Sequence, residues 1–151
     1  MIKRHILKRF FIFISFVVIV ACSTTPLPET INIVPPSSDV PPEVAAFSGA
    51  WQGIFFGALN VTFVVEEINT QSANVIYSWG DSPGGPGGYQ YATANVISGP
   101  SIEWIDRNQG KITYTMNRDL NSLEGIIHDS VENYTFKAQL KRVDLEQLLN
   151  K

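Results

Sequence analysis

Hydrophobic and polar residues alternate with a period of two along most of the chain from Phe47 onward. Successive side chains of a β-strand point to opposite faces, so this alternation predicts half-buried strands. The last run, residues 134–141, is the most regular, with apolar positions at Tyr134, Phe136, Ala138 and Leu140. The other positions predicted to face inward are Leu59, Val61, Phe63, Val65, Ala73, Val75, Tyr77, Trp79, Ala92, Ala94, Val96, Ile102, Trp104, Ile112, Tyr114, Met116, Leu123, Gly125 and Ile127.

Turn-forming triplets separate these runs at 69–71, 98–100, 108–110, 117–119 and 128–130. With a run around Trp51 they predict about eight short strands, and no helical pattern of ten residues lies between them. A βαβ fold is therefore excluded. We expect an all-β protein, an antiparallel up-and-down barrel of about eight strands over 47–142, since closure removes exposed strand edges. A short C-terminal helix or tail is expected over 143–151, with its leucines on one side.

The first 21 residues have a different composition, with four basic residues, no acidic residue and a continuous apolar stretch over 10–21 in which only Ser15 is polar. As a helix, twelve residues span about 18 Å, less than the roughly 30 Å of a bilayer core. The pattern predicts a signal peptide over 1–21.

The end of this segment, Ile19-Val20-Ala21-Cys22, resembles the lipobox of bacterial lipoproteins. The resemblance implies cleavage before Cys22, lipidation of Cys22 and anchoring of the protein to a membrane of the cell envelope. Ser23 in the next position implies the periplasmic face of the outer membrane in a Gram-negative cell; a Gram-positive surface is the alternative. An ordinary secretory signal that ends by chance in a cysteine is the other interpretation.

Residues 22–46 contain six of the nine prolines and show no apolar period of 2 or 3.6. Such a segment is typical of a semi-rigid linker, partly in polyproline II conformation. We expect a tether that holds the domain some tens of ångströms from the membrane, at about 3.1 Å per residue.

Charge and composition exclude several functions. The formal net charge of −3 becomes −7 without residues 1–21, which gives no basic footprint for nucleic acid. After cleavage His128 is the only histidine and Cys22 the only cysteine, so we expect no metal site, no cofactor and no catalytic residue.

Glu66 and Glu67 are adjacent on one strand and are expected on opposite faces, where they cannot act together. The glycine-rich segment 80–88 runs from strand to strand and lacks the lysine of a phosphate-binding loop. The chain is therefore not expected to be an enzyme.

Gly49-Ala50-Trp51-Gln52-Gly53 opens the first predicted strand with a G-x-W pattern that resembles the entry motif of the calycins, the lipocalin, fatty-acid-binding and avidin barrels. The stretch Ala73–Gly80 and the last strand resemble a small lipocalin-like or avidin-like bacterial domain. This resemblance implies a calycin-like barrel, with Trp51 at one closed end. The polar contacts of biotin-binding barrels have no match in this sequence.

Two functions remain open. In the first, the barrel binds a small apolar or amphipathic ligand, and the segment 80–88 is either a lid over its mouth or a plain surface loop. The residues expected to line the ligand site are Trp51, Tyr77, Trp79, Tyr91, Tyr114 and Phe136. In the second, the barrel is solid and a structural or inhibitor-like role uses a surface patch that contacts an envelope protein. The residues expected in that patch are Ile54, Phe56, Val64, Ile76, Ile105 and Ile126.

Overall fold

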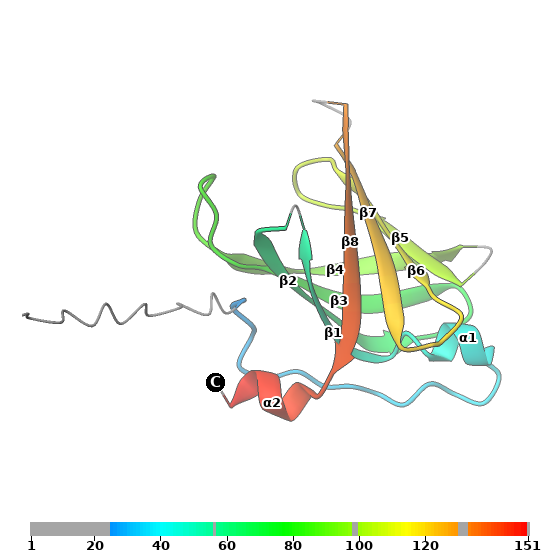
Figure 1. Cartoon of the computed structure of the whole chain (residues 1–151). Coiled ribbons are helices and arrows are strands. Elements are labelled where there is room, and N and C mark those ends of the chain that lie inside the picture. The colour runs from blue at the N-terminus through cyan, green and yellow to red at the C-terminus, as the bar shows by residue number, and fades with distance from the viewer. Residues whose placement is uncertain (1–24, 56, 98–99, 130–132, 151) are drawn as a thin grey trace, which may run out of the picture.

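The computed structural model describes residues 25–55, 57–97, 100–129 and 133–150; the predicted signal peptide and Cys22 lie outside these ranges. Its eight strands form one closed antiparallel barrel in chain order, in which the last strand pairs with the first (Figure 1). The predicted up-and-down barrel is therefore confirmed. The strands are β1 (Gly49–Phe55), β2 (Leu59–Ile68), β3 (Ser72–Trp79), β4 (Gly88–Ile97), β5 (Ser101–Ile105), β6 (Lys111–Met116), β7 (Ser122–Asp129) and β8 (Tyr134–Val143).

The core lies inside the barrel and consists mainly of the predicted inward positions. Val61, Phe63 and Leu140 have no exposed surface, and Ala94 and Ile102 pack among them. Tyr134 is the exception: it is the first residue of β8, at the end of the barrel wall, and 56% of it is exposed. Alternation thus predicted the orientation of nearly every strand.

One irregularity in β2 changes the expected positions of two carboxylates. The register with β3 shifts between Val65 and Glu67, which is a β-bulge. Val65 and Ile68 both face the core, so Glu66 and Glu67 both lie on the outer side. The expectation that these two side chains occupy opposite faces is therefore wrong, because a bulge adds one residue to the alternation.

A short helix closes one end of the barrel. The helix α1 (Pro42–Ala45) begins with a proline in its first turn, where the missing N–H costs no hydrogen bond. Val40 and Val44 are buried with Phe47 in the barrel core. The end of the expected tether therefore forms a plug, which consists of α1 and the flanking residues Val40 and Phe47.

Residues 25–34, which we call the strap, lie along the outside of the barrel before α1 (Figure 1). The hydroxyls of Thr25 and Thr62 are 2.5 Å apart, and the N–H of Val34 donates to the carbonyl of Glu66 at 2.7 Å. The expectation of a free tether over 22–46 is therefore wrong for residues 25–46. The physical reason is apolar burial: Leu27, Ile31 and Ile33 cover an outward apolar cluster of the barrel.

The helix α2 (Leu145–Leu149) follows β8, as expected for the C-terminal segment. The side chain of Asp144 accepts a hydrogen bond from the Glu146 N–H and caps the first turn. Leu145 and Leu148 pack against the same outward cluster as the strap. Within the described residues, no helix has the length and apolar character needed to cross a bilayer.

Candidate functional site

The end of the barrel opposite α1 contains a pocket of about 280 Å³. Strand ends and the β5–β6 connection form it, at the end where β1–β2, β3–β4 and β7–β8 also connect (Figure 1). We call it the mouth pocket. Its walls combine an apolar and aromatic half with a polar half: Leu59, Tyr77, Trp79 and Ile127 on one hand, and Gln90, Asp106, Arg107 and Asn108 on the other.

The polar half is built on an Asx turn. The Asp106 carboxylate accepts hydrogen bonds from the N–H groups of Asn108, at 2.9 Å, and Gly110, at 2.7 Å. Gln109 takes a left-handed conformation with φ 64° to complete the turn. Asp106 therefore orders the segment that places Arg107 and Asn108 at the pocket.

The aromatic half depends on a glycine across the strand. Trp79 pairs with Gly88 on β4, and an added Cβ at Gly88 would lie 3.0 Å from the indole ring. The indole therefore packs on the glycine backbone. Its ring lies 6.0 Å from that of Tyr77, whose backbone is two residues further into the barrel.

Tyr77 is a neutral hydrogen-bonding group at the pocket. Burial first, and then the nearby Asp106 carboxylate, raise the pKa of the Tyr77 phenol far above its ordinary value. The hydroxyl therefore keeps its proton through the physiological range, and the pocket presents an aromatic ring with a polar tip.

An aromatic cluster lies around Tyr77 in the barrel core. The ring centroids of Phe63 and Trp104 are 5.5 Å apart, those of Phe63 and Tyr114 are 4.6 Å apart, and those of Trp104 and Tyr114 are 5.7 Å apart. Gly125 faces Tyr114 on the next strand, where a Cβ would collide with the phenol ring. Glycine at this inward position therefore makes room for Tyr114.

The six predicted ligand-lining residues are dispersed. Tyr77 and Trp79 line the mouth pocket, and Tyr114 lies in the core cluster. Phe136 is half-buried on β8, with its ring 6.0 Å from that of Tyr134. Trp51 is buried at the closed end, where its indole N–H donates to the Phe47 carbonyl at 2.9 Å. The structure therefore agrees with Trp51 at a closed end and contradicts a place for it in the mouth pocket.

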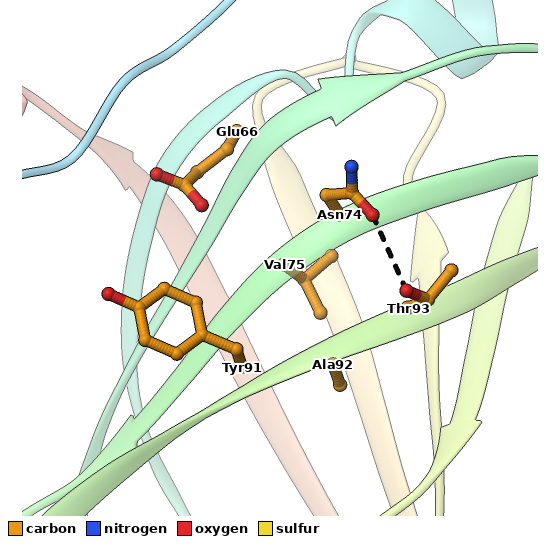
Figure 2. Close-up of a pocket in the computed structure, with 6 residues that line it drawn as sticks. All are labelled: Glu66, Asn74, Val75, Tyr91, Ala92 and Thr93. Atoms are coloured by element: carbon orange, nitrogen blue, oxygen red, sulfur yellow. Dashed lines mark hydrogen bonds between the residues drawn. The ribbon is translucent and has the colours of Figure 1, made fainter.

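Tyr91 faces the outside of the barrel, with 60% of its surface exposed, so the expectation that it lines the interior is wrong. It occupies the outward parity of β4, between the inward residues Gln90 and Ala92. Its ring lies beside an outer hollow, whose volume is about 380 Å³. Figure 2 shows the residues that line this hollow, among which the Thr93 hydroxyl donates to the Asn74 side chain.

This outer hollow is larger than the mouth pocket, but its chemistry is less suited to an apolar ligand. Asn74 also donates to Glu67, at 3.2 Å, and Glu66 accepts from the Asn32 N–H of the strap. Its polar groups are thus satisfied by one another on the outer face. The mouth pocket has four apolar or aromatic lining residues from the inward side of the barrel, so it is the better candidate for a ligand site.

Sequence reasoning missed the polar half of the pocket. For Gln90 the sequence does contain a signal of an inward position, because the residue has the inward parity of β4. In the structure its side chain is only 5% exposed. Asp106, Arg107 and Asn108 lie beyond the end of β5, and no alternation extends there. Leu59 and Ile127 were predicted to face inward but not to lie at the opening.

The glycine-rich segment forms its own turn beside the barrel end. Ser82 and Gly85 exchange two backbone hydrogen bonds of 3.0 Å, and the Asp81 carboxylate accepts from the Gly87 N–H. None of the mouth-pocket residues comes from 80–88, so the structure gives no support to a lid. In the described part of the chain, no group of three or more His, Cys, Asp or Glu side chains could hold a metal ion.

The predicted exposed patch does not form as one surface. Val64 and Ile76 have no exposed surface, because the strap and α2 cover them. Ile54 and Ile105 are exposed on separate strands, and Ile126 is half-buried. Phe56 lies outside the described residues. Periodicity identified outward apolar positions but not the chain segments that cover two of them.

Comparisons with known proteins bear on the fold alone. No protein-family model and no curated protein matches this chain. The chain is similar to the solved structure of a redesigned β-barrel. The similarity has a TM-score of 0.55 at 12% identity and covers 72% of this chain and 100% of the other. At that identity it supports the barrel architecture and carries no information about a ligand.

Proposed function

We propose that this protein is a non-catalytic, lipid-anchored binding protein of the cell envelope, and that its calycin-like barrel takes a small amphipathic ligand in the mouth pocket. The observation that carries the binding function is the asymmetry of the barrel. One end is filled by Val40, Val44 and Phe47, whereas the other holds a pocket with aromatic walls and a polar side. Its 280 Å³ lies just below the roughly 300–1,000 Å³ of most small-molecule sites, so the ligand is small.

The lipobox-like segment supports anchoring through Cys22 to the outer membrane of a Gram-negative cell. Thr25 contacts Thr62 of the barrel, so the lipidated position lies three residues before a residue that touches the barrel. Three extended residues span at most about 11 Å. The barrel would therefore lie directly at the bilayer surface, within reach of amphipathic molecules that partition there.

Ligand binding is tested on a soluble chain of residues 23–151, which contains every described element. Native mass spectrometry of protein purified from its own host should show a bound small molecule that denaturation releases. Ile127→Trp, which fills the mouth pocket, should abolish this extra mass. Its neighbour Ile126 faces outward, so Ile126→Trp is the matched control and should retain the ligand. Ligand retained by Ile127→Trp would overturn the proposed site.

A supporting test concerns the anchor. Palmitate labelling of the full chain in cells should mark the unmodified protein and not Cys22→Ala. A labelled Cys22→Ala variant would contradict the lipobox interpretation.

A further inference from the structure

Two buried hydrogen-bond donors of the aromatic cluster have no acceptor among the described residues: the indole N–H of Trp104 and the hydroxyl of Tyr114. Trp104 is 4% exposed and Tyr114 is fully buried. A buried polar group without a partner is costly, and native interiors contain few of them. An indole N–H can only donate, and a phenol donates readily, so both atoms call for an acceptor.

These donors lie in the barrel core, next to a residue of the mouth pocket. Tyr77 lines the mouth pocket, and its ring meets that of Trp104 edge-on at 5.8 Å. On the outer face, Trp104 and Ala92 contribute to a hollow of about 320 Å³ between β4 and β5, whose other walls are outward residues such as Tyr91 and Lys111. Those two strands pair over only three residue pairs, so few backbone hydrogen bonds join them there.

The surroundings favour an uncharged acceptor. The inward residues packed around the donors are apolar or aromatic, with no lysine or arginine among the described ones. Asp106, the charged group that acts on Tyr77, would repel an anion. Lys111 and Glu103 at the wall hollow lie 3.0 Å apart and neutralise each other. Arg107 lines the polar half of the mouth pocket and is exposed to water. A carboxylate at the donors would therefore be buried without a cation, which is strongly unfavourable.

We propose that Trp104 Nε1 and Tyr114 Oη together bind an uncharged acceptor, a ketone, ester or amide carbonyl, carried by the ligand of the mouth pocket. This inference rests on the proposed function and deepens it. It assigns the ligand class: a small amphipathic carbonyl compound, whose carbonyl inserts past Tyr77 while its remaining surface contacts Trp79, Leu59 and Ile127.

A matched pair of dyes tests this assignment on residues 23–151. Prodan carries a ketone on a dimethylaminonaphthalene ring system, and the parent dimethylaminonaphthalene lacks it. The unmodified protein should bind prodan more tightly than the parent. Tyr114→Phe should weaken prodan binding about two- to tenfold, the effect of one lost hydrogen bond, and should leave the parent dye unchanged. The control Tyr134→Phe removes a hydroxyl from an exposed tyrosine and should change neither affinity.

The thermal stability of Tyr114→Phe provides a second measurement. If the Tyr114 hydroxyl only stabilised the fold, its removal would lower Tm, whereas an unpartnered hydroxyl predicts the opposite change. In the absence of ligand, Tyr114→Phe should raise Tm by about 2–8 °C, because it removes a buried donor that has no partner. The indole N–H resonance of Trp104 should shift downfield with prodan and not with the parent dye.

The outcomes separate the two proposals. Failure of the unmodified protein to bind either dye would count against the mouth pocket as a ligand site. Binding of both dyes with prodan affinity unchanged in Tyr114→Phe would overturn the donor pair and leave the pocket standing. A lower Tm for Tyr114→Phe would show that the hydroxyl already has a partner, which also overturns the donor pair.

Discussion

Arg142 joins three parts of the chain at the closed end of the barrel. Its guanidinium lies 4.1 Å over the ring of Trp51 and donates to the backbone carbonyls of Ser48, at 2.8 Å, and Ala46. Those carbonyls follow α1 directly, so one side chain connects β8, β1 and the plug. Arg142 continues the inward parity of β8, two residues after Leu140, but alternation does not indicate which groups a cation there would bind.

Replacement of Arg142 should therefore destabilise the fold. We expect Arg142→Ala to lower the free energy of unfolding by about 1–3 kcal/mol, through loss of the cation–π contact and two charge-assisted hydrogen bonds. Urea denaturation of residues 23–151 measures this. The neighbouring exposed Lys141→Ala should stay within about 0.5 kcal/mol. Equal effects of the two variants would show that the contacts of Arg142 contribute nothing.

At the scale of elements, the strap and α2 act together as an outer layer. Three strap residues and two leucines of α2 pack on one cluster that includes Ala50, Val64 and Ile76. The Ser78 hydroxyl donates to the carbonyl of Pro26 at 2.5 Å, and Thr25 pairs with Thr62. Burial of these apolar side chains explains why a proline-rich segment with no regular period lies against the barrel instead of extending from it.

Adjacent strap residues allow a controlled test of this layer. Ile33 packs against the cluster, whereas Val34 is 41% exposed. Ile33→Asp should lower the free energy of unfolding by about 1–3 kcal/mol, since it places a charge on an apolar surface. Val34→Asp should change it by less than about 0.5 kcal/mol. Hydrogen exchange should then show faster exchange of the strap amides in the first variant only; unchanged exchange there would mean that the strap does not depend on this contact.

At the scale of the whole molecule, the fold raises the pKa of two buried tyrosine phenols. Burial and the Asp106 carboxylate raise the pKa of Tyr77, and burial with the nearby Tyr77 raises that of Tyr114 well above the ordinary value. In the unfolded chain both phenols lose their protons near pH 10. Above that pH the folded state binds more protons than the unfolded state, so stability falls as pH rises.

The free energy of unfolding should therefore be independent of these two groups below about pH 9.5. Above about pH 10 it should fall by up to about 2.7 kcal/mol per pH unit, about 1.4 for each phenol. Tyr114→Phe should halve the slope, because it removes one of the two phenols whose pKa the fold raises. Urea titrations across this range provide the measurement. A slope unaffected by Tyr114→Phe would show that this hydroxyl ionises in the folded state.

The candidate site was predictable only in part. Tyr77, Trp79 and Tyr114 have the inward parity of their strands and were found from alternation. The prediction for Tyr91 is wrong because its place beside a glycine-rich turn suggests the mouth of the barrel, whereas its parity on β4 points outward. Asp106 and Arg107 follow the last alternating residue of β5, and only the Asx turn brings them to the pocket.

The sequence by itself determined the strands, their order, the inward side of nearly all of them and the terminal helix. The reason is that period-two alternation and turn residues act locally, within a few positions. Only the tertiary structure decided which residues fill the closed end of the barrel, where the strap lies and which donors remain unpaired in the core. These features depend on contacts between residues far apart in the chain, such as Arg142 with Ser48 or Ser78 with Pro26, and no local pattern encodes them.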